Sequence, residues 1–228
     1  MGGEGTPIGA PPPPPALIER KPPCCLWSLR VDPFDLIFRR VTVEGEVAWG
    51  QLPFTAEVTG SWIFDSPNES LDEKGFDLGL NLAWYPGGEP LRGFWVKAHA
   101  EYESFDATLS RLDGDAPIGR PNPEFCDADS ATGTCKRRVQ SPIFGLLLGS
   151  TQVFGRKGGF ALSGGIGVGA AIADATSLEV RPCSPTDVSA ADPHCPAAEI
   201  GGTALGFRYY DDTARVRLLG SLSLGVAF

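Results

Sequence analysis

The sequence has no stretch of about 20 consecutive apolar residues, so no segment is expected to cross a bilayer as an α-helix. It has no basic excess either, because 28 acidic against 19 basic side chains give a formal charge of −9. Nucleic-acid binding needs a basic surface, so the acidic excess of this chain excludes nucleic acid as a partner. Residues 1–16 have neither a basic start nor an apolar core, so no signal peptide is predicted within this sequence.

Histidine is also scarce, with only His99 and His194. A serine–histidine–acid array needs a base within reach of its nucleophile, and no such pattern is visible, so we predict no enzymatic activity. The cysteines lack the C-x-x-C spacing of zinc sites. The acidic stretch 127–130 lacks the full calcium-loop pattern, and the glycines of 164–171 lack the strand-then-helix context of a dinucleotide fingerprint. We therefore expect no metal and no cofactor.

What the sequence does contain is a two-residue alternation, clearest over residues 214–228. Its even positions are Ala, Val, Leu, Gly, Leu, Leu, Val and Phe, whereas its odd positions are polar or small except for Leu219. A period of two indicates a strand, since successive side chains point to opposite faces. The stretch is longer than the usual strand of about 5–6 residues and reaches the about 9–11 residues that a tilted membrane strand needs.

The same alternation recurs along the chain and predicts eight strands. The other seven are expected over residues 25–32, 36–49, 54–65, 76–85, 94–103, 139–154 and 160–173. Long connections are expected at 66–74, 109–138 and 177–211, with short turns between them, as in membrane barrels. We predict an all-β fold: an eight-stranded antiparallel up-and-down transmembrane β-barrel over 24–228, preceded by a proline-rich disordered tail over 1–23.

Alternation alone does not say which face points inward. A soluble barrel turns its apolar face inward, whereas a membrane barrel turns it toward lipid. The aromatic residues near strand ends favour the membrane arrangement, because aromatics gather at both membrane interfaces. These are Trp49, Trp62, Phe64, Trp84 and Tyr102.

The polar faces then predict a network of paired charges in the lumen, because an unpaired buried charge costs several kcal/mol. Glycine and alanine at 161–173 would make room for the long charged side chains opposite them. The predicted lumen residues are Arg40, Glu44, Glu46, Glu57, Asp77, Lys97, His99, Glu101, Glu103, Arg215 and Arg217.

Six cysteines indicate an oxidising compartment. Cys126 and Cys135 bracket one stretch rich in turn residues, and Cys183 and Cys195 bracket another, so each pair is predicted to close one exposed loop with a disulfide. Cys24 and Cys25 are adjacent, and their state is left open.

The strand ending in V-A-F resembles the C-terminal recognition strand of bacterial outer-membrane proteins. L-R-V-D-P-F-D-L-I-F, V-E-G-E-V-A-W and G-F-D-L-G-L-N-L-A-W-Y-P-G-G-E-P-L-R-G-F are similar to small barrels of the OmpA/OmpX type. The resemblance covers 26–228 and implies a place in the outer membrane, contact with its lipid and insertion by the barrel assembly machinery. The implied assembly signal comprises Leu222, Leu224, Val226 and Phe228.

The alternation pattern and the resemblance together predict a structural or surface-binding barrel with a side-chain-filled lumen, whose extracellular loops are available to bind an unidentified ligand. Three alternatives stay open: a small pore, a lipid A-modifying barrel enzyme and a soluble lipocalin-like binder of a hydrophobic ligand.

Overall fold

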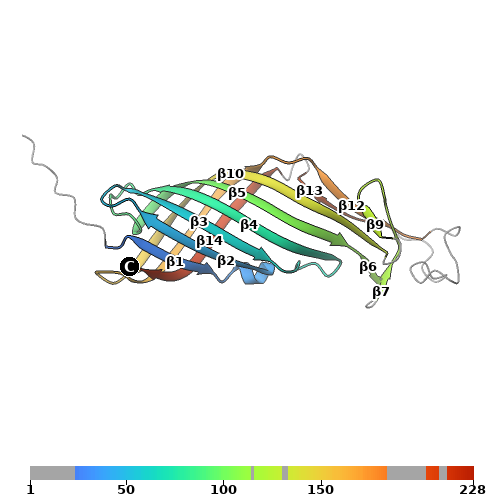
Figure 1. Ribbon diagram of the computed structural model, residues 1–228, viewed down its shortest axis with the longest axis horizontal. Helices are drawn as coiled ribbons and strands as arrows, with labels where there is room; N and C mark the ends of the chain where they lie inside the picture. The colour runs from blue at the N-terminus through green and yellow to red at the C-terminus, as the bar shows by residue number, and fades with distance from the viewer. Residues whose placement is uncertain (1–23, 114–115, 130–132, 184–203, 211–214) are drawn as a thin grey trace, which may run out of the picture.

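The computed structural model describes residues 24–113, 116–129, 133–183, 204–210 and 215–228. Within them the chain forms a closed, antiparallel, eight-stranded β-barrel (Figure 1). The wall strands are β1 (Trp27–Asp32), β2 (Arg40–Ala48), β3 (Phe54–Ile63), β4 (Leu71–Trp84), β5 (Gly93–Leu109), β10 (Thr134–Phe154), β11 (Gly159–Ala171) and β14 (Val216–Ala227). The predicted tail lies outside these residues.

Each wall strand pairs with its neighbours in the chain, and the barrel closes where β1 meets β14. Where these two strands meet, the Phe228 carbonyl accepts hydrogen bonds from the N–H groups of Leu26 and Trp27 at 2.9 Å each. Both ends of the described chain therefore lie at the same end of the barrel, while the long connections lie at the other (Figure 1). We call these the inner and the outer end.

The wall strands differ from the predicted ranges mainly at the outer end. The predicted loops 66–74 and 109–138 are too long, because β4 already begins at Leu71, β5 continues to Leu109 and β10 begins at Thr134. The predicted strand 36–49 is also too long, since a 3₁₀ turn, η1 (Asp35–Phe38), ends at Arg39 in the left-handed region (φ 59°). Asp32 starts this bend by accepting the Phe34 N–H at 2.8 Å.

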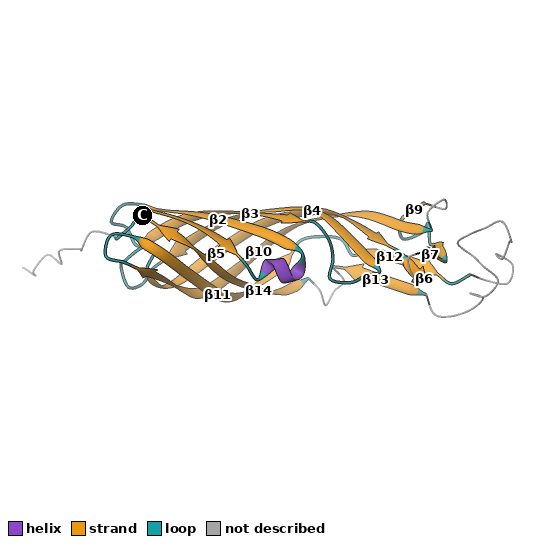
Figure 2. Cartoon of the chain, turned by 90° about the horizontal axis from the view of Figure 1, so that it is seen from below, coloured by secondary structure: helices purple, strands orange, loops and turns teal. Residues whose placement is uncertain are grey.

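The outer connections carry short strands of their own. A hairpin joins β6 (Arg111–Asp113) to β7 (Ala116–Ile118), and β9 (Asp127–Asp129) extends the wall beside β10. A separate sheet comprises β8 (Arg120–Pro121), β12 (Thr176–Arg181) and β13 (Leu205–Tyr209). Figure 2 shows these strands at the outer end of the barrel, and we refer to them together as the cap.

The seam between β1 and β14 is incomplete. β1 pairs with β14 only over Ser28–Val31, so in the described part of the chain β11 is the sole strand partner of β14 outward of Leu224. The Asp32 carboxylate accepts the Leu222 N–H there at 2.9 Å. A cleft of about 510 Å³ opens at this place, lined by the η1 segment and by β11 and β14.

The interior of the wall is polar and its exterior apolar. On β2, Thr42, Glu44 and Glu46 are buried, whereas Val41 and Val43, which alternate with them, are exposed. This is the reverse of a soluble barrel. No helix in the described part of the chain is long and apolar enough to span a bilayer.

Candidate functional site

Arg30 of β1 lies at the centre of the lumen and is 1% exposed. Its guanidinium contacts three carboxylates: Nε donates to Glu44 at 3.0 Å, Nη1 to Glu46 at 2.8 Å, and Nη2 to Glu57. Ser28 and Ser223 accept the remaining donated bonds at 2.6 and 3.2 Å. One planar donor group therefore joins β1 to β2, β3 and β14.

Lys97 of β5 balances this cluster from the opposite wall. Its Nζ lies 2.6 Å from Glu57 and 4.0 Å from Glu46. Three carboxylates thus face two basic side chains at side-chain exposures of 7% or less. Glu46 additionally accepts hydrogen bonds from Thr55 and from Tyr85, the latter at 2.9 Å. Such pairing is what allows ionised groups to be buried.

Trp95 fills the lumen beside Lys97 and is fully buried. Its ring centroid lies 4.4 Å from Lys97 Nζ, and its indole N–H donates to Thr151 at 3.0 Å. A Cβ at Gly149 or Gly165 would come within 2.3 Å of the indole ring. Those two glycines therefore make room for an aromatic side chain, whereas the sequence pattern predicted that the small residues of 161–173 would make room for charged ones.

A second charged cluster lies further out. Arg40 pairs with Asp77 at 3.0 Å, Arg217 pairs with Glu103 at 3.2 Å, and His99 Nε2 lies 3.3 Å from Glu101. A cavity of about 180 Å³ between the two clusters is lined by members of both. It is also lined by Asp32 and Asp35.

Of the eleven predicted lumen residues, ten contribute to these two clusters. Arg215 does not: β14 begins only at Val216, and Arg215 is exposed ahead of it. The prediction missed Arg30, Trp95, Tyr85 and Asn81. Arg30 lies on the polar face of the predicted strand 25–32, but only the three-dimensional pairing of strands shows that three glutamates surround it.

The outer end of the lumen is apolar. Phe105, Val139 and Ile143 of the wall pack with Leu178 of β12 and Tyr209 of β13 in one buried cluster. The rings of Phe105 and Tyr209 meet edge-on with centroids 5.3 Å apart. Tyr209 also donates a hydrogen bond to Glu73 of β4, and burial together with this carboxylate raises the pKa of the phenol. The cap therefore closes the outer mouth of the lumen.

The inner end is closed by a smaller cluster of Cys25, Ala48, Leu91, Val153, Ala161 and Ala227. Cys24 and Cys25 are free thiols whose sulfur atoms lie 2.6 Å apart. Burial and the neighbouring thiol raise the pKa of Cys25 to about 12.

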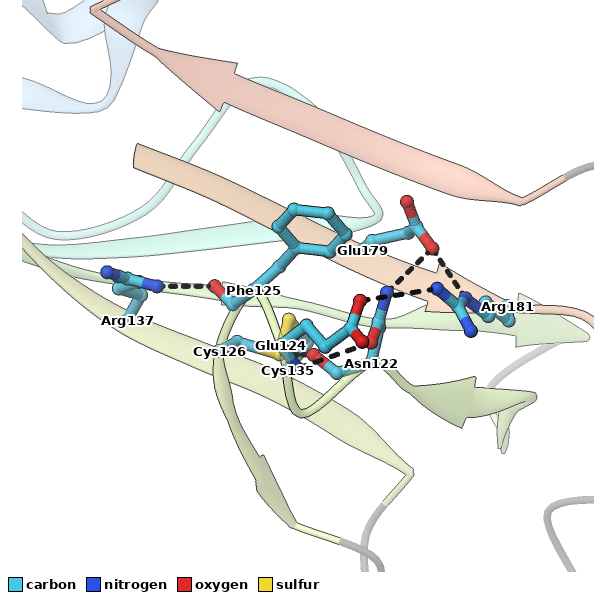
Figure 3. Close-up of a disulfide and its surroundings, with 8 residues drawn as sticks. All are labelled: Asn122, Glu124, Phe125, Cys126, Cys135, Arg137, Glu179 and Arg181. Atoms are coloured by element: carbon cyan, nitrogen blue, oxygen red, sulfur yellow. Dashed lines mark hydrogen bonds and ion pairs between the residues drawn. A yellow bond between two sulfur atoms is a disulfide. The ribbon is translucent and has the colours of Figure 1, made fainter. Parts of the chain in front are cut away.

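A disulfide joins Cys126, next to β9 of the cap, to Cys135 of the wall strand β10, which confirms that predicted pair (Figure 3). Cys183 is likewise disulfide-bonded, while its predicted partner Cys195 lies outside the described residues. Next to the first disulfide, Glu179 accepts hydrogen bonds from Asn122 at 3.0 Å and from Arg181 at 2.7 Å (Figure 3). These two donors lower the pKa of Glu179.

The exterior of the wall carries two rings of exposed aromatic side chains. The inner ring has one member at or beside an end of every wall strand: Trp27, Trp49, Phe54, Trp84, Phe94, Phe154, Phe160 and Phe228. The outer ring comprises Phe34, Phe38, Trp62, Phe64, Phe76, Tyr102 and Phe144.

The two rings are eight residues apart on β3, β4 and β5, as from Phe54 to Trp62. At about 3.3 Å per residue and a tilt of about 35–45°, this spans about 20 Å along the barrel axis. The described outward side chains between the rings are apolar or small, apart from Ser150 and Gln152 of β10. Of the predicted assembly-signal residues, Leu222, Val226 and Phe228 point outward in this band, and Leu224 is half-buried.

No family model matches this chain, and no curated protein or solved structure matches it significantly.

Proposed function

We propose that this chain is an integral outer-membrane barrel that holds a disulfide-pinned cap at the cell surface as a binding module. The observation that carries the proposal is the uncharged apolar band between two aromatic rings. Its height is close to the about 25 Å apolar band of known membrane barrels, and the charged side chains at that level point inward. Water would disfavour this arrangement, because dozens of large apolar side chains would be exposed.

The membrane role is tested by tryptophan fluorescence in liposomes that contain brominated lipid, which quenches nearby indoles. Trp62 is 64% exposed on the outer ring, whereas Trp95 is buried in the lumen. Two variants, each retaining one of these tryptophans with the other four changed to Phe, form a matched pair. We expect strong quenching of Trp62 and weak quenching of Trp95, compared with non-brominated lipid.

Folding of each variant is checked by the difference in migration between unheated and boiled samples on SDS gels. A chain that stays monodisperse in buffer without detergent, or a Trp62 that brominated lipid does not quench, would refute the membrane role.

The lumen is proposed to be closed rather than conducting, because buried clusters of side chains close it at the inner end and at the cap. Single-channel recording in planar bilayers tests this, and steady conductance of the folded protein would favour the small pore instead. We propose further that the role is binding and not catalysis. Unchanged mass spectra of lipid A from cells that produce the barrel would agree, whereas a new lipid A species would contradict it.

The terminal strand is proposed as the segment that the barrel assembly machinery recognises. Phe228 is exposed at the inner end, and its backbone closes the barrel against Trp27. Changing Phe228 to Ala should reduce the heat-modifiable form in cell envelopes while leaving refolding in detergent nearly unchanged. Equal losses in both assays would point to a purely structural role for this residue.

A further inference from the structure

The seam between β1 and β14 leaves backbone groups of β14 without a strand partner. The Leu222 N–H points into the seam, where it reaches the Asp32 carboxylate at 2.9 Å. Residues two apart along a strand turn their N–H and C=O groups to the same side, so those of Gly220 and Leu218 also point into the seam. Among the described residues, no strand pairs with β14 on this side outward of Leu224. An open strand edge is costly in hydrocarbon, because lipid tails offer it no hydrogen bonds.

The cleft at this seam is apolar where it faces the membrane. Two members of the outer ring, Phe34 and Phe38, line it from the η1 side, and Leu218 and Leu222 line it from β14. All four side chains are exposed, Leu218 with 82% of its surface. Gly220 leaves the space between the two leucines open, because a Cβ built there would meet only one atom outside its chain neighbours, 3.9 Å away. The cleft of about 510 Å³ can therefore take up an alkyl chain.

Where it faces the lumen, the same cleft is acidic. Asp32, Asp35, Leu219, Gly220 and Ser221 line both this cleft and the lumen cavity of about 180 Å³. The two spaces therefore adjoin, and the charged side chains that line both of them are the two aspartates. An occupant that enters from the membrane meets apolar side chains first and negative charge at its inner limit.

No cation of the described chain neutralises these two acids. Arg39 and Arg40 follow them in the sequence, but the two guanidinium groups pair with the carboxylates of other residues at 3.3 and 3.0 Å. Both oxygens of Asp32 accept backbone N–H groups. Asp35 accepts one hydrogen bond, from Thr42, and its Oδ1 receives none from the described residues. Carboxylates at membrane depth are rare without a partner, so we expect a cation from outside the chain.

We propose that the seam cleft binds a membrane amphiphile with a single alkyl chain and a primary ammonium head group. The alkyl chain lies between η1 and β14, and the ammonium group binds Asp35 at the level of the outer ring. An ammonium group has three donors and no acceptor, which suits a carboxylate beside the unpaired carbonyl groups of Gly220 and Leu218. This inference rests on the proposed membrane role, because the apolar side of the cleft would otherwise face water.

The test uses the full chain folded in phosphatidylcholine vesicles and two photoreactive probes, a primary alkylamine and an alcohol with the same diazirine-bearing chain. Mass spectrometry of digests locates the adducts after illumination. We expect the amine to label residues 34–38 and 218–222 at least about tenfold more than the alcohol does, with labelling of outward β4 residues as the reference. This factor corresponds to one hydrogen bond to a charged group.

Three variants separate the head group from the chain. Asp35→Asn should reduce labelling by the amine to near that by the alcohol, whereas Gly220→Ile should fill the cleft and reduce labelling there by both probes. Asp65→Asn is the matched control, because Asp65 is also an acid beside the outer ring but does not line the cleft, and 41% of its side chain is exposed. It should label as the parent does. Different migration of unheated and boiled samples on SDS gels confirms that each variant is folded.

Equal labelling of the cleft by both probes, or an Asp35→Asn variant that keeps the preference for the amine, would overturn the proposal and leave the membrane role intact. Crosslinks between β14 strands of two copies, with the cleft unlabelled, would make a second copy the occupant and would also overturn it. A folded chain without adducts on β4 would refute the membrane role and this inference with it.

Discussion

β5 passes through two regions of opposite polarity. From Lys97 to Glu103 its inward side chains are polar or charged, and its outward side chains are apolar, as Phe94 and Tyr102 are. Beyond that point the faces exchange roles: Phe105 is buried inside, while Asp106 is partly exposed outside. On β10 only the outward face changes, where Phe144 gives way to Lys136, because the inward Leu147, Ile143 and Val139 are apolar on both sides of that point.

The exchange shows where the surroundings of the barrel change. A strand packs its apolar face against whichever neighbour is apolar. For the wall this is the lipid that we propose around it, and for the part of the barrel beyond Glu103, which we call the outer extension, it is the cap. One continuous strand can therefore be built as a membrane wall over one half and as a water-soluble sandwich over the other.

The largest effect is expected from removing the central cation of the wall. In Arg30→Met, three buried glutamates lose their common partner, which should lower the free energy of unfolding by about 3–5 kcal/mol. Urea titration of the detergent-folded protein measures this. Arg39→Met is the matched control, since its ion pair with Asp65 is about half exposed, and it should cost less than about 1 kcal/mol. Similar losses in both variants would contradict a packed lumen.

A smaller effect is expected from placing a charge on the outer surface. Leu80→Arg puts a cation in the middle of the apolar band and should cost about 2–4 kcal/mol in liposomes. Thr108→Arg puts the same side chain on the outward face of the extension and should change stability by about 0.5 kcal/mol or less. If both substitutions cost the same, the boundary between the two regions does not lie near Glu103.

The smallest effect is expected in the cap. Its Glu179 has a pKa below that of the unfolded chain, so the bonds from Arg181 and Asn122 stabilise the cap fully above the unfolded pKa, and this stabilisation is lost as the pH falls through the lower pKa of the folded state. Hydrogen exchange of β12 should therefore accelerate as the pH falls below about 4, after correction for intrinsic rates. Glu179→Gln should flatten this dependence, with exchange of β3 amides as an internal reference.

The eight-strand barrel was predictable because alternation specifies which residues share a face. Glu44, Glu46 and Glu57 fall on one face by parity alone, and the aromatic strand ends indicated that this face points inward. The residues at which the strands end at the outer end of the barrel were harder to predict from the sequence. There the alternation continues, but its polarity inverts, so residues 71–75, 104–109 and 134–138 did not extend the pattern of the wall.

Which residues line the lumen was easier to predict than which of them contact one another. Ile143 and Leu147 made the β10 segment apolar on both faces, and only the structure shows their partners, the cap cluster and the cluster around Trp95. The choice of Arg30 as the common partner of three acids depends on the stagger of four strands, which parity does not specify. Arg215 lies outside the two lumen clusters because β14 begins at Val216, two residues later than the predicted strand.

The short pairing of β1 with β14 also bears on the order of folding. Ser28 and Ala227 are neighbours in space although almost the whole chain separates them, so joining them carries a loop-closure entropy cost of about 5 kcal/mol. Four residue pairs and the terminal hydrogen bonds repay that cost, whereas every other wall contact forms between strands adjacent along the chain or joined by the cap. We therefore expect the contact between β1 and β14 to form last in folding, and the seam beside η1 to be the first place where the barrel opens.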